Sequence, residues 1–211
     1  MIKKIIFDLD DTLIINDDNS INDYVEVLKK HDNDFSFEKA KELYKCIDKY
    51  EKVVNYFDKE DLLKFINNYF NKNYSIDFVN DILDAVGNWC YLIPDNLIDT
   101  LDYLSSKYEL YVLTNWFTSS QSKRLEKANI RKYFKEIAGP EKSVKPAKES
   151  FEYFFNDCEP NECLIIGDRY EIDIKVPIEL GMNGLLYDRL KKYDNIDCDK
   201  FYDWKELKDI L

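Results

Sequence analysis

The sequence has few of the residues from which zinc sites and disulfide frameworks are built. Its 211 residues include one histidine, His31, and five scattered cysteines (Cys46, Cys90, Cys158, Cys163 and Cys198), none of them in a C-x-x-C pair. An odd number of dispersed cysteines beside a single histidine excludes both a zinc site and a disulfide framework. We therefore expect reduced, mostly buried thiols and a cytoplasmic protein.

Long apolar runs and a surplus of basic residues are also missing. No stretch approaches the roughly 20 apolar residues that cross a membrane, and the apolar run near the N-terminus is too short for a signal peptide. With 30 Lys and Arg against 42 Asp and Glu, the formal net charge is −12. That charge repels nucleic acids and anionic membranes, so we expect neither as a partner.

The chain does contain enough apolar material for a sizeable core. Hydrophobic residues make up 45% of the sequence and aromatic residues 15%. A chain of this length and composition folds as one medium domain, or as a core with a small satellite.

The N-terminal part of the chain predicts one strand and then only helices. Residues 2–8 are continuously apolar after Lys4, which is typical of a central strand in a parallel sheet. Over 15–91 the apolar residues recur every three or four positions, and the two clearest series are Leu43, Ile47, Tyr50, Val54, Phe57 and Phe78, Ile82, Ala85, Trp89. Shorter helices are predicted around 21–30 and 60–70, with NDDNS and HDNDFS as turns or helix starts.

After Pro94 the pattern alternates between helix and strand. Helices are predicted over 95–106, 118–128, 147–155 and 171–180, and strands over 109–114, 136–138, 163–167 and 184–187. Such alternation is typical of a parallel, doubly wound sheet. The sequence therefore predicts an α/β fold, with a Rossmann-like core over 1–14 and 92–211 and a small all-α domain over 15–91.

Acidic and polar residues gather where the predicted strands end, which is where such sheets bind ligands. These segments are DLDDT (8–12), TNW (114–116), SVKP (143–146) and GDRYEID (167–173). Each alone is consistent with a turn, a helix cap or a solvated charge. Together they crowd carboxylates that repel one another unless a cation or a shared proton is present, and a hard divalent metal resolves the repulsion.

In this order the segments resemble the four motifs of the haloacid dehalogenase-like hydrolase superfamily, and of its phosphatase branch in particular. The matching residues are Asp8-Leu9-Asp10-Asp11-Thr12, Leu113-Thr114-Asn115, Lys145-Pro146, and Gly167-Asp168 with Asp173. The resemblance covers the whole chain, because this family commonly inserts a cap domain between its first and second motifs. It implies that the helical region 15–91 is such a cap.

The resemblance also implies a Mg²⁺-dependent phosphatase acting on a small phosphomonoester. Asp8 would be the nucleophile that forms an aspartyl-phosphate, and Asp10 would act as general acid and then as general base. Thr114 and the backbone of Asn115 would donate hydrogen bonds to the phosphoryl oxygens. Lys145 would neutralise the nucleophile and the transition state.

The cofactor implied by the resemblance is Mg²⁺. Asp8, Asp168 and the backbone carbonyl of Asp10 would hold the ion, while Asp173 would orient these ligands or reach the ion through water. A carboxylate at Asp10 favours phosphate esters over haloacids, because cleavage of a carbon–halogen bond needs no proton for the leaving group. A sugar phosphomutase of the same fold remains the alternative. A non-catalytic binding module is disfavoured, since all the motif residues are present.

The substrate is less well defined by the sequence. A cap closing over the site favours a small metabolite such as a sugar phosphate, a nucleoside monophosphate or a glycolate-type phosphate. Trp116 is interpreted either as a pocket wall or as a core aromatic, and Arg169 is expected to point to solvent. Tyr44 and Tyr50 are expected to pack in the cap core, and no catalytic role is assigned to His31.

Overall fold

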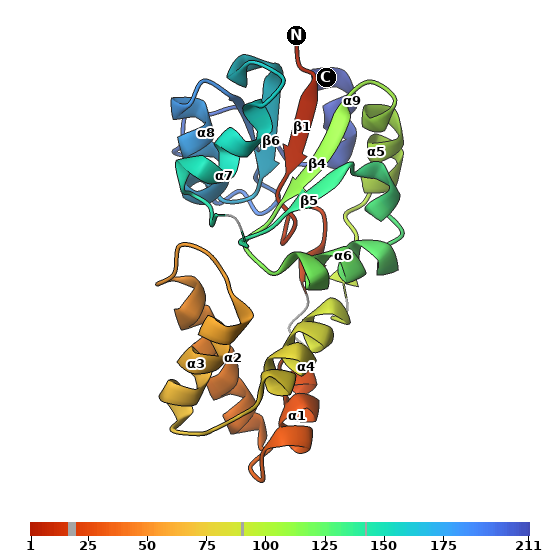
Figure 1. The fold of residues 1–211 in the computed structure, drawn as a ribbon. Helices are drawn as coiled ribbons and strands as arrows, with labels where there is room; N and C mark the ends of the chain where they lie inside the picture. Colours follow the sequence, from red (N-terminus) through yellow and green to blue (C-terminus); the bar gives the residue numbers. More distant parts are fainter. Residues whose placement is uncertain (17–19, 90, 142) are drawn as a thin grey trace.

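The structure, a computed structural model, describes residues 1–16, 20–89, 91–141 and 143–211. Figure 1 shows a sheet flanked by helices and, below it, a separate group of helices, with both chain termini at the far end of the sheet. No helix within the described ranges combines the length and the apolar character that a membrane span requires.

The sheet has the predicted Rossmann-like form. Its strands are β1 (Lys4–Phe7), β4 (Glu109–Leu113), β5 (Glu136–Ala138), β6 (Cys163–Gly167), β7 (Asn183–Tyr187) and β8 (Lys200–Phe201). They lie in the order β5-β4-β1-β6-β7-β8, and each neighbouring pair is parallel. The continuous apolar run of the first strand is thus explained, because β1 is central and buried on both faces.

Helices cover both faces of the sheet (Figure 1). Successive residues of β1 point to opposite faces, so Ile5 and Phe7 join one apolar core and Ile6 joins another. The first core is closed by α5 (Leu97–Ser105), α6 (Thr118–Lys127) and α9 (Leu207–Ile210). The second is closed by α7 (Lys148–Glu152) and the segment that leads to α8 (Lys175–Glu179).

Four helices form the bundle below the sheet: α1 (Ser20–His31), α2 (Phe37–Glu51), α3 (Lys59–Phe70) and α4 (Ile76–Gly87). Ser36 and Asp58 cap α2 and α3 by accepting backbone N–H bonds in the first turn. The bundle has its own apolar core, which continues onto Trp116 and Phe117 of the segment after β4. The hydroxyl of Ser120 in α6 also donates to a carbonyl of α4 (2.7 Å). The domain limits at 14/15 and 91/92 stay a prediction.

Three apolar residues that continue the helical spacing lie outside helices. α2 ends at Glu51, so Val54 and Phe57 lie in the loop before α3, and Trp89 follows the end of α4. Phe57 is nevertheless buried, because its ring packs edge-on against Trp116. Its position is set by tertiary packing, and the match to the spacing of α2 is coincidental.

Two predicted helices are interrupted. The helix predicted over 147–155 is α7 followed by the 3₁₀ turn η2 (Tyr153–Phe155), and that predicted over 171–180 begins with the π-helical turn η4 (Tyr170–Ile174) before α8. Pro177 has no N–H to offer the carbonyl four residues earlier, so regular α-helical bonding cannot extend back through this segment.

Several short elements escaped the sequence analysis. β2 (Ile15–Asn16) pairs antiparallel with β3 (Tyr91–Leu92), and β8, the 3₁₀ turn η5 (Trp204–Glu206) and α9 end the chain. Elements of two to four residues are too short to display a period. Cys46, Cys158, Cys163 and Cys198 are free thiols, as expected, whereas Cys90 and residues 17–19 of the NDDNS stretch lie outside the described residues.

The central position of β6 predicts how the protein responds to a cavity there. Ile166 is 0% exposed, so Ile166→Ala is expected to lower the free energy of unfolding by about 2–5 kcal/mol. Ile210→Ala is the matched control because Ile210 is 49% exposed. Urea unfolding followed by circular dichroism measures both losses, and equal losses would contradict the packing described.

Candidate active site

The residues predicted to act together come to one edge of the sheet. Asp8 follows β1, Thr114 follows β4 and Asp168 follows β6, and these three strands are adjacent and parallel. Lys145 reaches the same edge from the segment before α7 and is 2% exposed. The strand order therefore brings together side chains that are distant in the sequence.

Lys145 forms the electrostatic centre of this edge. Its Nζ donates to Oδ1 of Asp8 (2.5 Å) and to Oδ1 of Asp173 (2.7 Å), and all three residues are at most 3% exposed. Burial alone would lower the pKa of Lys145, but Asp173 and Asp8 hold that pKa above its ordinary value. The ammonium therefore remains charged and offsets the repulsion between the two carboxylates.

The backbone around this centre explains two further motif residues. The side chain of Asn115 donates from Nδ2 to the Lys145 carbonyl (2.9 Å) and accepts from the Lys145 N–H at Oδ1 (2.8 Å), so it holds the lysine loop. Asp173 also accepts the backbone N–H of Arg169 (3.0 Å). A Cβ on Gly167 would lie 2.4 Å from the Cβ of Asp173, so only glycine fits there.

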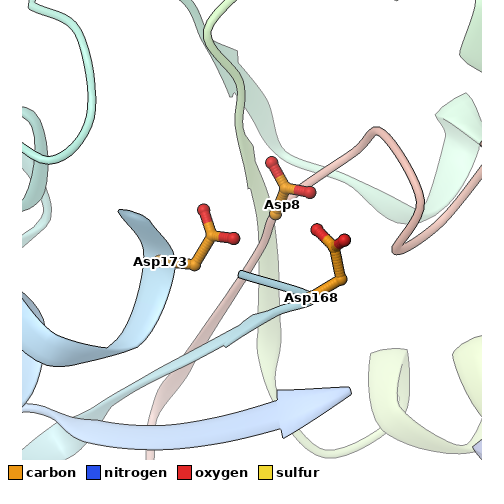
Figure 2. Close-up of side chains that lie close together, drawn as sticks. All are labelled: Asp8, Asp168 and Asp173. Atoms are coloured by element: carbon orange, nitrogen blue, oxygen red, sulfur yellow. The ribbon is translucent and has the colours of Figure 1, made fainter. Parts of the chain in front are cut away.

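Three carboxylates at this edge fit a hard divalent cation. One oxygen each from Asp8, Asp168 and Asp173 lies within 4.8 Å of the others, with Asp8 and Asp168 at the ends of neighbouring strands (Figure 2). Oδ1 of Asp168 is buried without a hydrogen-bond partner among the described residues. Burial, and then the charges of Asp8 and Asp173, raise the pKa of Asp168 to about 8. Burial likewise raises the pKa of Asp8 to about 6, although Lys145 opposes it.

Asp10 has different partners, which the sequence analysis missed. Its Oδ1 accepts from Nη1 of Arg124 (2.5 Å), and its Oδ2 accepts from Nε2 of Gln121 (2.9 Å). The same Nε2 donates to Oγ1 of Thr114 (2.9 Å). Gln121 and Arg124 lie one turn apart on α6 and are both at most 1% exposed. Only their i,i+3 spacing on one helix face marks them in the sequence, and that spacing is common.

The turn after β1 supports the carboxylate of Asp8. Thr12, which is fully buried, donates its hydroxyl to Oδ2 of Asp8 (3.0 Å). Between them, Asp11 adopts a left-handed conformation with φ 62°, which aspartate tolerates better than most residues. Its N–H donates to the carbonyl of Ile14 (2.8 Å) and closes the turn.

A cavity of about 220 Å³ opens in front of these residues, between the sheet edge and the helical bundle. Asp8, Asp10 and Asp168 line it on the sheet side. Tyr44, which the sequence analysis placed in the cap core, is 45% exposed and lines the bundle side, whereas Tyr50 is buried as expected.

Trp116 and Arg169 complete the sheet side of the cavity. Trp116 lines the cavity and also packs in the bundle core, where it is 7% exposed, so both interpretations of this residue hold. Arg169 is exposed, as expected, but on the cavity wall. Desolvation opposes its charge, yet Asp173, Asp8 and Asp168 raise its pKa. His31 lies elsewhere, bonded to Asp81 (2.7 Å).

Comparison with known proteins places these motifs in context. The model of the haloacid dehalogenase-like hydrolase family matches residues 5–186. A glyceraldehyde 3-phosphate phosphatase from Methanocaldococcus jannaschii is 27% identical over 231 aligned positions, which cover 100% of this chain and 97% of that protein. The HAD-hydrolase YfnB from Bacillus subtilis is 35% identical over 86 residues, or 38% of this chain and 37% of that protein.

A solved structure shows the same fold. The crystal structure of YfnB bound to magnesium superimposes with a TM-score of 0.72 and 20% identity, and the match covers 100% of this chain and 98% of that chain. At this identity the similarity concerns the fold alone.

The raised pKa of Asp168 predicts how pH affects metal binding. Without a cation, Asp168 keeps its proton below about pH 8, and Mg²⁺ must displace that proton. The rise in melting temperature caused by Mg²⁺ is therefore expected to be larger at about pH 9 than at about pH 6, as measured by differential scanning fluorimetry.

The matched variants are Asp168→Asn, which is expected to lose the Mg²⁺ effect, and Asp209→Asn at an exposed position, which is expected to keep it. A Mg²⁺ effect that is absent at every pH, or that is greater at the lower pH, would contradict the site.

Proposed function

Because the chain belongs to the family of haloacid dehalogenase-like hydrolases, we propose that it is a Mg²⁺-dependent phosphatase of small phosphomonoesters. The observation that supports this best is the pairing of two acids with different surroundings in one cavity. Asp8 is 3% exposed and bound to a lysine, whereas the side chain of Asp10 is 36% exposed. The proposed reaction needs two acids within reach of one phosphoryl group, one as nucleophile and one as proton donor.

In the first half-reaction, Asp8 attacks phosphorus in line with the leaving oxygen. The new bond joins a carboxylate oxygen of Asp8 to phosphorus, and the bond from phosphorus to the leaving oxygen breaks. Asp10 gives its proton to that oxygen, so that the alcohol leaves neutral. The Lys145 ammonium, 2.5 Å from Asp8, stabilises the charge that develops on the phosphoryl oxygens.

In the second half-reaction, water hydrolyses the aspartyl-phosphate. Asp10, now ionised, takes a proton from the water as its oxygen bonds to phosphorus. The bond between phosphorus and Asp8 then breaks, which releases inorganic phosphate, restores the Asp8 carboxylate and leaves Asp10 protonated for the next turnover. Arg124 and Gln121 fix the position of Asp10 throughout, because each donates to one of its oxygens.

Mg²⁺ would be held by Asp8, Asp168 and the backbone carbonyl of Asp10. The orphaned oxygen of Asp168 supports this assignment. When bound, the ion would neutralise the clustered carboxylates and the phosphoryl oxygens. Asp173 would orient the ligands of the ion, because both of its oxygens already accept hydrogen bonds, one from Lys145 and one from the N–H of Arg169.

The substrate would be a small phosphorylated metabolite. The match to a glyceraldehyde 3-phosphate phosphatase spans the whole chain, which favours small sugar phosphates. A cavity of about 220 Å³ is also too small for a phosphoprotein segment or a nucleic-acid strand. The four described free thiols support the expected cytoplasmic location. Within this class, formation of a phosphorylated product would indicate the phosphomutase alternative.

Replacement of the nucleophile tests the proposal. Asp8→Asn is expected to reduce Mg²⁺-dependent phosphate release by at least about three orders of magnitude, because the amide cannot form the aspartyl-phosphate. Phosphate release is measured on an aryl phosphate and a panel of sugar phosphates, with Mg²⁺ or with EDTA.

Asp209→Asn makes the same chemical change at an exposed position and should match the wild type. Wild-type rates in a folded Asp8→Asn protein would rule out this mechanism.

A further inference from the structure

The bundle side of the cavity is acidic. The C-terminal turns of α2 contribute Asp48 and Glu51 to this wall, and Tyr44 lies one turn before them. The carbonyl end of a helix carries partial negative charge, which adds to that of the two carboxylates. Asp48 is paired with Lys52 on the same helix (2.8 Å), so Glu51 is the less compensated of the two.

Glu51 has no hydrogen bond or ion pair with any described residue. Its side chain is accessible to solvent, and it lines the cavity. Protein atoms still surround it closely enough that desolvation, followed by the charges of Asp10 and Asp48, raises its pKa to about 8. A group that donates hydrogen bonds to this carboxylate would relieve both effects.

The position of Glu51 relative to Asp10 indicates what it faces. Asp10 is the proposed donor to the leaving oxygen, so the body of the leaving group extends from Asp10 into the cavity. Glu51 and Tyr44 both interact electrostatically with Asp10 from the bundle side. The leaving group must therefore pass close to Glu51.

The positive charges that line the cavity come from its sheet side. Among the described lining residues, the cations are Arg124, which is paired with Asp10, and Arg169, which follows Asp168 at the phosphoryl end. None of the described cap residues that line the cavity is basic. Arg169 and Lys52 lower the pKa of Glu51, but by less than burial, Asp10 and Asp48 raise it. A second anion on the leaving group would thus meet a wall on which carboxylates predominate.

Two tryptophans also line the same cavity. The indole Nε1 atoms of Trp89 and Trp116 are buried and lack a hydrogen-bond partner among the described residues, and both side chains line the cavity. A hydroxyl group of a ligand can donate a hydrogen bond to the Glu51 carboxylate, which an ionised carboxylate of a ligand cannot do.

We propose that Glu51 selects phosphomonoesters whose leaving group is uncharged and carries hydroxyls, as in polyol and sugar phosphates. It accepts hydrogen bonds from those hydroxyls and repels leaving groups that carry a carboxylate or a second phosphate. This selectivity rests on the phosphatase function proposed above and assigns a substrate class to that site.

The test compares two esters that differ in one group. Glycerol 1-phosphate and glycerate 3-phosphate differ by a hydroxymethyl group in place of a carboxylate, and an aryl phosphate serves as reference. At about pH 9, where Glu51 is ionised, wild-type kcat/KM is expected to favour the glycerol ester by roughly tenfold or more, the effect of one unfavourable charge contact. Glu51→Gln, which keeps the shape of the side chain, should narrow this ratio, and Glu51→Lys should reverse it.

Glu38→Gln is the matched control. It makes the same change on the exposed N-terminal turn of α2, away from the cavity, and should keep the wild-type ratio. A wild-type enzyme that hydrolyses both esters equally, or ratios that neither Glu51 variant alters, would overturn the selectivity while the aryl phosphate still reports phosphatase activity. Failure of the wild type on all three esters, with Mg²⁺ present, would instead overturn the proposed function and this inference with it.

Discussion

The active site depends on one buried ammonium. Lys145 lies between the carboxylates of Asp8 and Asp173, with distances of 2.5 and 2.7 Å, where water cannot screen their repulsion. Loss of one partner from a buried ion pair typically lowers the free energy of unfolding by about 3–5 kcal/mol. The motif residues around Lys145 therefore serve largely to keep its ammonium in place. Asn115 holds the backbone of the lysine, and Gly167 leaves the space into which Asp173 packs.

Charge is balanced differently on the two sides of the cavity. On the sheet side Asp8, Asp10 and Asp173 each have a cation or a hydrogen-bond donor, and the orphaned oxygen of Asp168 marks where a metal ion would complete the balance. On the bundle side Glu51 has no hydrogen bond or ion pair with a described residue, and Arg169 and Lys52 offset only part of the burial and negative charge that raise its pKa. The unpaired oxygen of Asp168 fits the proposed metal ion, and the negative charge of Glu51 fits hydroxyl groups of the proposed leaving group. Binding of substrate and metal can thus supply the hydrogen bonds and the positive charge that these carboxylates lack in the folded protein.

The sequence predicted the sheet side of this arrangement well. Asp8, Thr114 and Asp168 stand directly after apolar strands, so parallel pairing alone brings them to one edge. The bundle side was not predicted. Glu51 and Tyr44 occupy ordinary helix positions, and only the three-dimensional structure shows that they line the cavity. Gln121 and Arg124 were missed for the same reason. The end of α2 and the two-residue strand β8 depend on packing that leaves no periodic pattern.

The most direct test of the account is to find the phosphoryl group on the protein during turnover. The enzyme is mixed with Mg²⁺ and an aryl phosphate, quenched in acid within the first turnovers, digested and analysed by mass spectrometry. The account predicts one added phosphoryl group on the peptide containing Asp8, located on Asp8 itself and absent from Asp8→Asn. Continued release of phosphate with no phosphorylated peptide, or with the group on another residue, would contradict it.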